Sequence, residues 1–499
     1  MQNSGLDNEG IILMINHEIT NLTLYVDKNL AILREHFHHS SDLVTRTIKL
    51  GHNTGCLLFI DDIVNIDYVQ DCIITPLLEI NVTSDLKKDT FMEDLSYRHI
   101  RSGLVEIVTT FESCIQGVLK GKTLILFDGY SCGILAETTE WKQRNVEQSL
   151  AQRTAVGPMH GFNEQLKVNI NLIRNMVQTP HLCIEVIQVG TFSKTEIAIT
   201  YINGKVDQKV LEETKERLST LEIDYVLEAR MIEDAIEGRK KTFFPLTFNT
   251  ERPDAVASNL YEGRIAILVN GTPNAMIVPA IFLQHFQSPD DYYLKTGRYS
   301  NRFITFLSFC FTIFLPGVYL AIEKFHKDWF PKKFEKKLFT DLNSLPPAIL
   351  EVLIFLIILQ MVLIASVRVS KEIVVTVALV GAIVLSETAV NAKLIHPVSL
   401  VVVGLTILAN FLVTLNGLGS VINPLRIIFL FVGNFFGFTG MGIIFVLLIV
   451  YMVKLRSVGV PYLAPIIPFR PQEFKDIFYR GNLKKMINSP HKYPHDDKE

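Results

Sequence analysis

The sequence predicts an α/β cytoplasmic region of two tandem similar modules, followed by an all-α multi-pass membrane bundle and a short C-terminal cytoplasmic segment. Three observations support this fold class: motifs recur at a constant spacing before residue 303, long apolar runs are confined to residues 303–453, and the segment after them is basic. The predicted boundaries are 1–140 for the first module, 141–162 for the linker, 163–302 for the second module, 303–453 for the transmembrane helical bundle, and 454–499 for the C-terminal segment with its disordered tail.

Two motifs in the N-terminal part of the chain occur twice. Phe59–Asn65 (FIDDIVN) resembles Tyr201–Asp207 (YINGKVD), and Leu126–Gly129 (LFDG) resembles Leu268–Gly271 (LVNG). Both pairs are displaced by 142 residues, since 201 minus 59 and 268 minus 126 give the same value. The shared displacement indicates a duplication.

Each copy has the sequence pattern of a small α/β module. An apolar run of strand length is followed by a polar turn and then by a helical segment. A later apolar run reaches Asp128-Gly129 in the first copy or Asn270-Gly271 in the second, and continues into another apolar run. This is the pattern of a β-hairpin whose turn needs a positive φ, so we expect the two turns in equivalent places.

The C-terminal part begins with the apolar run Phe303–Ile322, which carries no charge. At 1.5 Å per residue such a run spans a hydrocarbon core of roughly 30 Å. Four further apolar runs lie near 349–367, 373–390, 397–416 and 427–453. The last run continues without a charge for longer than the core of a soluble protein requires, so we predict a membrane bundle.

Basic residues flank this bundle on both sides, with Lys295, Arg298 and Arg302 before it and a basic segment after Val453. By the positive-inside rule both ends then lie in the cytoplasm, which demands an even number of crossings. Five runs conflict with this unless one run is interfacial or the longest is broken near Gly437–Gly442. The prediction is therefore four to six crossings.

The sequence shows no catalytic constellation, and we expect neither an enzyme nor a cofactor nor a metal site. The six cysteines are scattered without a CxxC pair, and His36, His38 and His39 lack a further ligand at metal-site spacing, so we expect a solvated helix face. The net charge of −3 argues against nucleic acid as a partner. The N-terminus lacks the basic and apolar regions of a signal peptide, so we expect the modules in the cytoplasm.

A predicted helix from Glu372 to Asn391 is the candidate lining of an ion path. It combines small residues with β-branched valines, which give a stiff apolar wall, and it carries one acidic group that would favour cations. An alternative is that this acidic group lies at the membrane interface near Lys393 and is solvated there. The expected pore-lining residues are Val377, Val380, Gly381, Val384 and, near one mouth, Glu387.

Several motifs resemble those of one protein family. They are Thr250-Glu251-Arg252-Pro253-Asp254, Glu262-Gly263-Arg264, Gln287–Tyr293, Gly459–Pro465 and Pro468-Phe469-Arg470-Pro471. In combination these residues resemble the A subunits of GerA-type spore germinant receptors of endospore-forming Firmicutes. The resemblance covers about residues 130–490.

This resemblance implies a multi-pass protein of the spore inner membrane with cytoplasmic N-terminal modules. It implies a homo-oligomer that acts with a transporter-like B subunit and a lipoprotein C subunit, in a complex that responds to a small nutrient germinant. The A subunit would be the ion-conducting or signal-transmitting component that starts ion release. Nutrient binding needs to supply a few kcal/mol of differential affinity to shift such a two-state bundle, and no turnover is required.

Two alternatives stay open at this point. One is an accessory A-subunit paralogue that amplifies germination ion release without a nutrient of its own. The other is a secondary transporter, for which inverted membrane repeats and broken midplane helices are expected, whereas the apolar runs are unequal.

Overall fold

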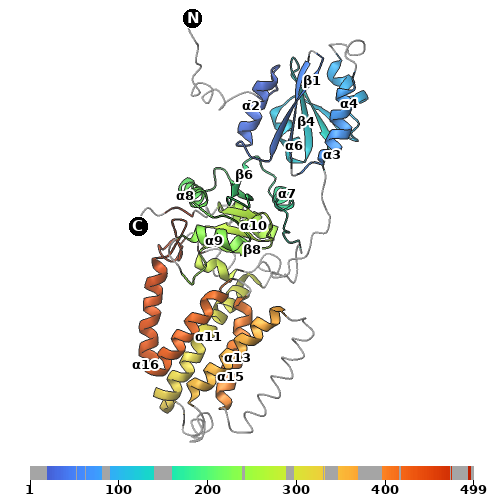
Figure 1. The fold of residues 1–499 in the computed structure, drawn as a ribbon. Coiled ribbons are helices and arrows are strands. Elements are labelled where there is room, and N and C mark those ends of the chain that lie inside the picture. Colours follow the sequence, from blue (N-terminus) through green and yellow to red (C-terminus); the bar gives the residue numbers. More distant parts are fainter. Residues whose placement is uncertain are drawn as a thin grey trace. The chain divides into compact units, whose positions relative to one another are not determined.

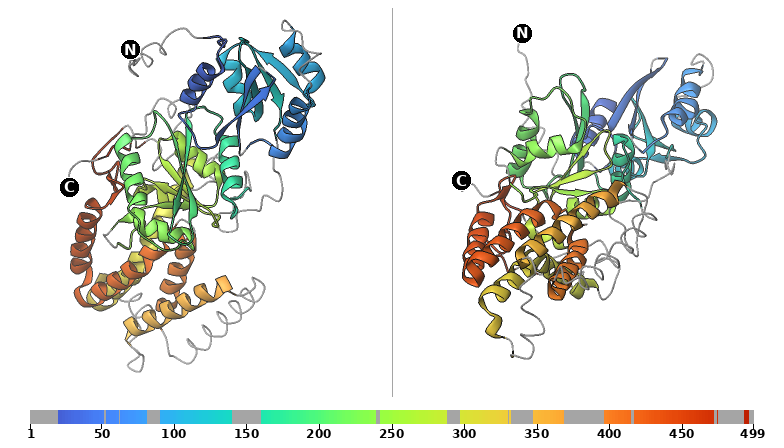
Figure 2. Two further views of the ribbon diagram at one scale, coloured as in Figure 1. Left: turned by 45° about the horizontal axis from the view of Figure 1, so that its top comes forward. Right: turned by 60° about the horizontal axis from the view of Figure 1, so that its bottom comes forward.

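The computed structural model describes residues 20–51, 53–61, 63–80, 90–139, 160–238, 242–287, 297–329, 331, 347–368, 396–414, 417–471, 474 and 493–495. The chain divides into two compact units (Figures 1 and 2). The N-terminal unit comprises Met1–Leu150, Met159–Ala235 and Thr250–Ile277, and the C-terminal unit comprises Ala151–Pro158, Ile236–Asn249 and Val278–Glu499. The C-terminal unit thus includes a short segment, Ile236–Asn249, that lies in sequence between two parts of the N-terminal unit.

The first sheet of the N-terminal unit has the strand order β1-β2-β4-β5-β3, and its neighbouring strands pair antiparallel. Its strands are β1 (Leu43–Leu50), β2 (Asn53–Ile60), β3 (Val105–Val108), β4 (Lys122–Phe127) and β5 (Gly133–Glu137). The helical elements of this module are α2 (Val26–His36), α3 (Ile66–Val69), η1 (Gln70–Ile74), α4 (Thr75–Leu78), α5 (Phe91–Asp94), η2 (Leu95–His99) and α6 (Phe111–Leu119).

Helices cover both faces of this sheet (Figure 1). Alternate residues of a strand point to opposite faces, so Leu58 of β2 packs in one apolar cluster with residues of α2 and α6. Its neighbour Leu57 packs in a second cluster with residues of α3, η1, α4 and α5. The module therefore has three layers, with the sheet in the middle.

The second sheet has the order β6-β7-β9-β10-β8, which repeats the order of the first. Its strands are β6 (Leu182–Val189), β7 (Thr195–Ile202), β8 (Phe248–Thr250), β9 (Ile265–Val269) and β10 (Ala275–Val278). The helices of this module are α7 (Leu166–Met176), α8 (Gln208–Ser219), α9 (Ala229–Glu237) and α10 (Pro253–Tyr261).

The predicted hairpin turns are present in both sheets. Gly129 follows β4 with a φ of 86°, and Gly271 follows β9 with a φ of 92°, a region that glycine adopts without steric cost. The side-chain oxygens of Asp128 and Asn270 accept hydrogen bonds from the first backbone N–H of α2 and of α7, at 2.8 Å and 3.2 Å. The polar residue that precedes each glycine therefore satisfies a free N–H group at the start of a helix.

The C-terminal unit is helical. Its elements are η3 (Phe282–Phe286), α11 (Gly297–Phe325), η5 (Lys327–Trp329), α13 (Ala348–Arg368), α15 (Pro397–Thr414), α16 (Gly419–Val453), β11 (Arg456–Ser457) and β12 (Val460–Pro461). Two segments of the described chain, Asn301–Phe325 in α11 and Gly419–Val453, are long and apolar enough to cross a membrane.

The helices α11 and α16 cross at two glycines. A Cβ atom on Gly433 would lie 2.3 Å from the carbonyl oxygen of Gly317, and a Cβ atom on Gly317 would lie 2.4 Å from the carbonyl oxygen of Phe429. Both distances are far below van der Waals contact, so the crossing depends on residues without a side chain.

Helix α16 is not continuous. Gly437 has φ 60° and ψ −153°, outside the helical region. The ribbon of α16 folds back on itself (Figure 1). A break of the longest apolar run near Gly437–Gly442 was one of the alternatives predicted from the sequence, and in the structure this break lies at Gly437.

Candidate functional site

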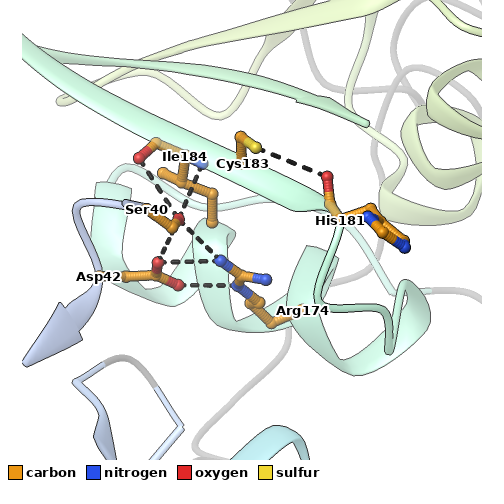
Figure 3. Close-up of polar contacts among 6 residues, drawn as sticks. All are labelled: Ser40, Asp42, Arg174, His181, Cys183 and Ile184. Atoms are coloured by element: carbon orange, nitrogen blue, oxygen red, sulfur yellow. Dashed lines mark hydrogen bonds and ion pairs between the residues drawn. The ribbon is translucent and has the colours of Figure 1, made fainter. Parts of the chain in front are cut away.

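A buried ion pair joins the two modules of the N-terminal unit (Figure 3). Arg174, near the end of α7, is 1% exposed. Its Nε donates to Asp42 Oδ2 at 2.7 Å and its Nη2 donates to Asp42 Oδ1 at 2.9 Å. Asp42 lies directly before β1, in the other module. We call Arg174, Asp42 and Ser40 the inter-module clasp.

Ser40 connects this ion pair to the second sheet. Its Oγ donates to Asp42 Oδ1 at 2.6 Å and accepts from Arg174 Nη2 at 2.9 Å and from the backbone N–H of Ile184 at 3.0 Å. The backbone N–H of Ser41 donates to the carbonyl oxygen of Ile184 at 2.8 Å. Because Ile184 belongs to β6, the segment before β1 is held against an edge strand of the second sheet.

A histidine pair lies beside the clasp. Nε2 of His38 and Nδ1 of His181 are 3.0 Å apart, and the side-chain amide of Asn203 donates to His38 Nδ1 at 2.9 Å. Burial lowers the pKa of His38, and the neighbouring His181 lowers it further. His36 and His39 are exposed, as the sequence predicts, whereas His38 is half-buried because its ring contacts His181 and Asn203 of the second module.

A second polar cluster lies within the C-terminal unit, and we call it the Glu351 cluster. Glu351 of α13 is 3% exposed. Its Oε1 lies 2.9 Å from His396 Nδ1, and its Oε2 accepts from the backbone N–H of His396 at 3.1 Å and from Ser399 Oγ at 3.0 Å. Ser399 Oγ also lies 3.0 Å from the hydroxyl oxygen of Tyr319. The cluster therefore links α11, α13 and α15 around one buried carboxylate.

A third polar contact joins α13 to α16. The amide of Asn423 donates to Gln360 Oε1 at 3.1 Å, and Arg426 Nη2 donates to Asn423 Oδ1 at 2.5 Å. Arg426 is buried, at 3% exposure. Polar groups in apolar helices are costly unless they are hydrogen-bonded, so this contact and the Glu351 cluster are candidate functional positions.

The sequence reasoning singled out Glu387 in the apolar part of the chain and missed both of these contacts. The signal was available, because Glu351 and Arg426 are charged residues within apolar helices. Their partners were not accessible to sequence reasoning, since Glu351 and His396 are 45 residues apart.

The family motif around Thr250 forms the start of α10. Pro253 occupies the first turn, where its missing N–H costs nothing, and the buried Arg252 donates through Nε and Nη2 to Asp254 at 3.0 and 2.7 Å. The backbone N–H of Arg252 donates to Thr250 Oγ1 at 3.2 Å, and the carbonyl oxygen of Glu251 accepts from the backbone of Phe162. These residues thus fix a helix start in the second module.

The second family motif lies after β12 in the C-terminal unit. Pro468, Phe469 and Pro471 are exposed, and the Phe469 ring lies 5.3 Å from that of Phe474. The backbone N–H of Arg470 donates to the carbonyl oxygen of Pro465 at 2.9 Å.

The predicted pore-lining residues, Val377, Val380, Gly381, Val384 and Glu387, lie outside the described residues. The ion path through Glu372–Asn391 stays a prediction from the sequence.

The cysteines are free thiols. Burial raises the pKa of Cys56 to about 11 and that of Cys114 to about 12, so these thiols are protonated at neutral pH and are poor nucleophiles. Among the described residues, no group of three or more His, Cys, Asp or Glu side chains could hold a metal ion.

These features define a class of protein in which an α/β unit is joined in sequence to an apolar helical unit that contains buried charged residues. The chain belongs to the Bacillus/Clostridium GerA spore germination protein family, whose model matches residues 31–492. This confirms the family resemblance that the motifs indicated.

Relatives match along most of the chain. It is 32% identical over 458 residues to Spore germination protein KA of Bacillus subtilis (strain 168), covering 91% of this chain and 84% of that protein. It is 29% identical over 463 residues to Spore germination protein GerLA of Bacillus cereus, covering 92% and 93%. The crystal structure of the N-terminal domain of the A subunit of the Bacillus megaterium spore germinant receptor GerK3 is 30% identical, with a TM-score of 0.43, and covers 53% of this chain and 99% of that one.

Proposed function

We propose that this chain is the A subunit of a nutrient-responsive spore germinant receptor, and that it conducts ions or transmits the signal that starts ion release. The observation that carries the proposal is the family match over residues 31–492. The related A subunit of GerK3 is described as part of a spore germinant receptor, and the other relatives are described as spore germination proteins.

The C-terminal unit supports a membrane location in this proposal. Its two long apolar helices have the length that a crossing needs, and the rest of the unit adds the apolar helices α13 and α15. We place the chain in the spore inner membrane as a multi-pass protein, with its N-terminal modules in the cytoplasm. In this proposal it is a homo-oligomer that works with a transporter-like B subunit and a lipoprotein C subunit.

The Glu351 cluster supports a role in ion movement or gating. A buried carboxylate among apolar helices is expensive, and such groups mark ion pathways and relays in membrane proteins. Glu351 also ties three helices together, so a change in its partners would change how α11, α13 and α15 pack. No catalytic step is part of the proposal, because differential binding of a nutrient supplies the free energy for a population shift.

The alternative of a secondary transporter is less well supported by the described helices. Transporters place broken helices near the membrane midplane. The break at Gly437 instead lies against Phe325, at the end of α11. The alternative of an accessory paralogue fits the same structure, so an experiment has to distinguish it from a nutrient-responsive receptor subunit.

The test uses spores that lack the gene, exposed in turn to amino acids, sugars and nucleosides while potassium release is recorded. We expect loss of release in response to at least one nutrient, and restoration by the wild-type gene and by Glu222→Gln, an exposed control. Glu351→Gln should restore less, because charge-assisted hydrogen bonds contribute about 1.5–3 kcal/mol each.

The outcomes separate the alternatives. Uniformly slower release for every nutrient would favour the accessory paralogue. Unchanged release together with lost uptake of a solute would favour a transporter and would contradict the receptor proposal.

A further inference from the structure

Both ends of α16 contact the same short segment of the C-terminal unit. Ser420 Oγ donates to the carbonyl oxygen of Phe243 at 3.2 Å, and the hydroxyl of Tyr451 donates to Thr242 Oγ1 at 2.9 Å. Ser420 and Tyr451 are 31 residues apart, since 451 minus 420 is 31. A straight helix would separate them by about 46 Å at 1.5 Å per residue, so the helix must double back.

The place where it doubles back is the far end of α11. An ideal Cβ on Gly437 would lie 3.1 Å from the ring of Phe325, the last residue of α11. The next ring, Phe438, stacks on Trp329 with centroids 5.5 Å apart and 7° between the planes, and it lies 5.2 Å from His326.

The start of α11 lies instead with the segment that holds the two ends of α16. A chain of ring contacts runs from Phe306 to Phe286 (5.3 Å), from Phe286 to Phe282 (5.1 Å) and from Phe282 to Phe244 (6.3 Å). Phe306 and Phe325 are separated by 325 minus 306, or 19 residues. This corresponds to about 28 Å of helix, close to the roughly 30 Å of a hydrocarbon core.

We propose that α16 crosses the bilayer twice, as a helical hairpin whose bend reaches the non-cytoplasmic interface. The first limb is Gly419–Phe436 and the second limb is Phe438–Val453. The inference rests on the proposed function in one respect, namely that the chain is a membrane protein with a cytoplasmic N-terminal unit.

The side chains at the bend are those of a membrane interface. Trp329 stacks on Phe438, the His326 ring lies tilted against both of these rings, and Lys324 Nζ lies 5.4 Å from the centroid of the Phe435 ring. Tryptophan and lysine are the residue types that sit at the level of the lipid headgroups. A bend buried in the middle of the hydrocarbon would place Lys324 there as well, at a high cost.

The second limb presents an apolar stripe to its surroundings, and we assign lipid acyl chains as its partner. Ile443, Val446, Leu447 and Val450 follow helical spacing and are 58%, 58%, 56% and 49% exposed in the single chain. No charged residue lies between Ile427 and Val453, and the charge of Lys454 follows at once. The whole second limb, Phe438–Val453, therefore carries no charge, which fits a hydrocarbon environment.

The hairpin also resolves the number of crossings. The five apolar runs of the sequence give an odd number, whereas the basic residues before α11 and after α16 place both ends of the bundle on one side. When the longest run crosses the bilayer twice, the number of crossings rises from five to six and becomes even.

The test maps single cysteines in the full chain, in intact cells, with a membrane-impermeant maleimide. Cys72, Cys132 and Cys310 are only partly buried and are replaced by serine, whereas the buried Cys56, Cys114 and Cys183 stay. The probes are Thr439→Cys at the bend, Asp328→Cys after α11, Leu447→Cys in the second limb and Lys28→Cys in the N-terminal unit, all exposed residues. A spin label attached to Val446→Cys then measures how often apolar oxygen and a polar nickel chelate collide with this position. High oxygen and low nickel collision rates indicate lipid around the label.

We expect Thr439→Cys and Asp328→Cys to react from outside, Lys28→Cys to react only after permeabilisation, and Leu447→Cys to react from neither side. The spin label at Val446 should show high oxygen and low nickel access. An unreactive Thr439→Cys beside a reactive Asp328→Cys would overturn the hairpin and leave the membrane location intact. An unreactive Asp328→Cys would count against the membrane location itself. Disulfide cross-linking of two copies through Val446→Cys would replace lipid by a second copy as the partner of the stripe.

Discussion

Arg174 and Arg34 show how one residue type serves two purposes at matching places of the two modules. Arg34, near the end of α2, is exposed and donates to Thr45 Oγ1 at 2.5 Å within its own module. Arg174, near the end of α7, is buried and pairs with Asp42 of the other module. The difference arises because residues of the first module, among them Asp42, pack over Arg174, whereas Arg34 faces solvent.

We predict that Arg174→Ala destabilises the contact between the modules by about 3–5 kcal/mol, because it leaves the buried Asp42 without its counter-charge. Arg34→Ala is the matched control and should cost less than about 1 kcal/mol. The measurement is amide hydrogen exchange of Ser41 and Ile184, whose hydrogen bonds cross the contact.

The double variant Arg174→Met with Asp42→Leu separates charge from packing. Replacing a buried ion pair by apolar residues of similar volume is often neutral, so protection of Ser41 and Ile184 should largely return. Unchanged exchange in Arg174→Ala would show that the clasp does not hold the modules together.

At the scale of elements, the crossing of α11 and α16 depends on the absence of side chains. We predict that Gly433→Ala separates the helices, since the added methyl would meet the Gly317 carbonyl oxygen at 2.3 Å. Overpacking of this kind costs about 1–3 kcal/mol and should lower the Tm of the detergent-solubilised chain by several degrees. Gly442→Ala is the control, because no atom lies within 4 Å of its added Cβ. Equal Tm values for the two variants would contradict this account of the crossing.

The sequence allowed the two hairpins to be predicted, because Asp128-Gly129 and Asn270-Gly271 encode a local conformation that needs no distant partner. It did not allow the clasp to be predicted. Arg174 and Asp42 are 132 residues apart, and their pairing depends on how two folded modules meet. The bend of α16 could be predicted only in part. A glycine permits the positive φ of the bend, so the sequence indicates a region for it, but the contact with Phe325 that accompanies the bend at Gly437 is visible only in the structure.

At the scale of the whole molecule, two polar groups mark different parts of the proposed membrane bundle. Glu351 is buried among α11, α13 and α15, and its hydrogen bonds bind helices together. Glu387 belongs to the predicted pore helix, outside the described residues. Fully paired groups such as Glu351 suit the closure of a bundle, whereas an acidic group near a pore mouth suits selection of cations.

The final prediction tests this division of roles. Val380→Ser should make the pore leak, so that cells lose potassium or spores germinate without nutrient, because a hydroxyl wets an apolar constriction that gates by dewetting. Glu387→Gln should shift ion selectivity without preventing assembly. Val446→Ser is the matched control on the proposed lipid-facing stripe and should not leak. If Val380→Ser and Glu387→Gln both assemble and leave ion release and its selectivity unchanged, the helix from Glu372 to Asn391 does not line the path, and a partner subunit becomes the better candidate for conduction.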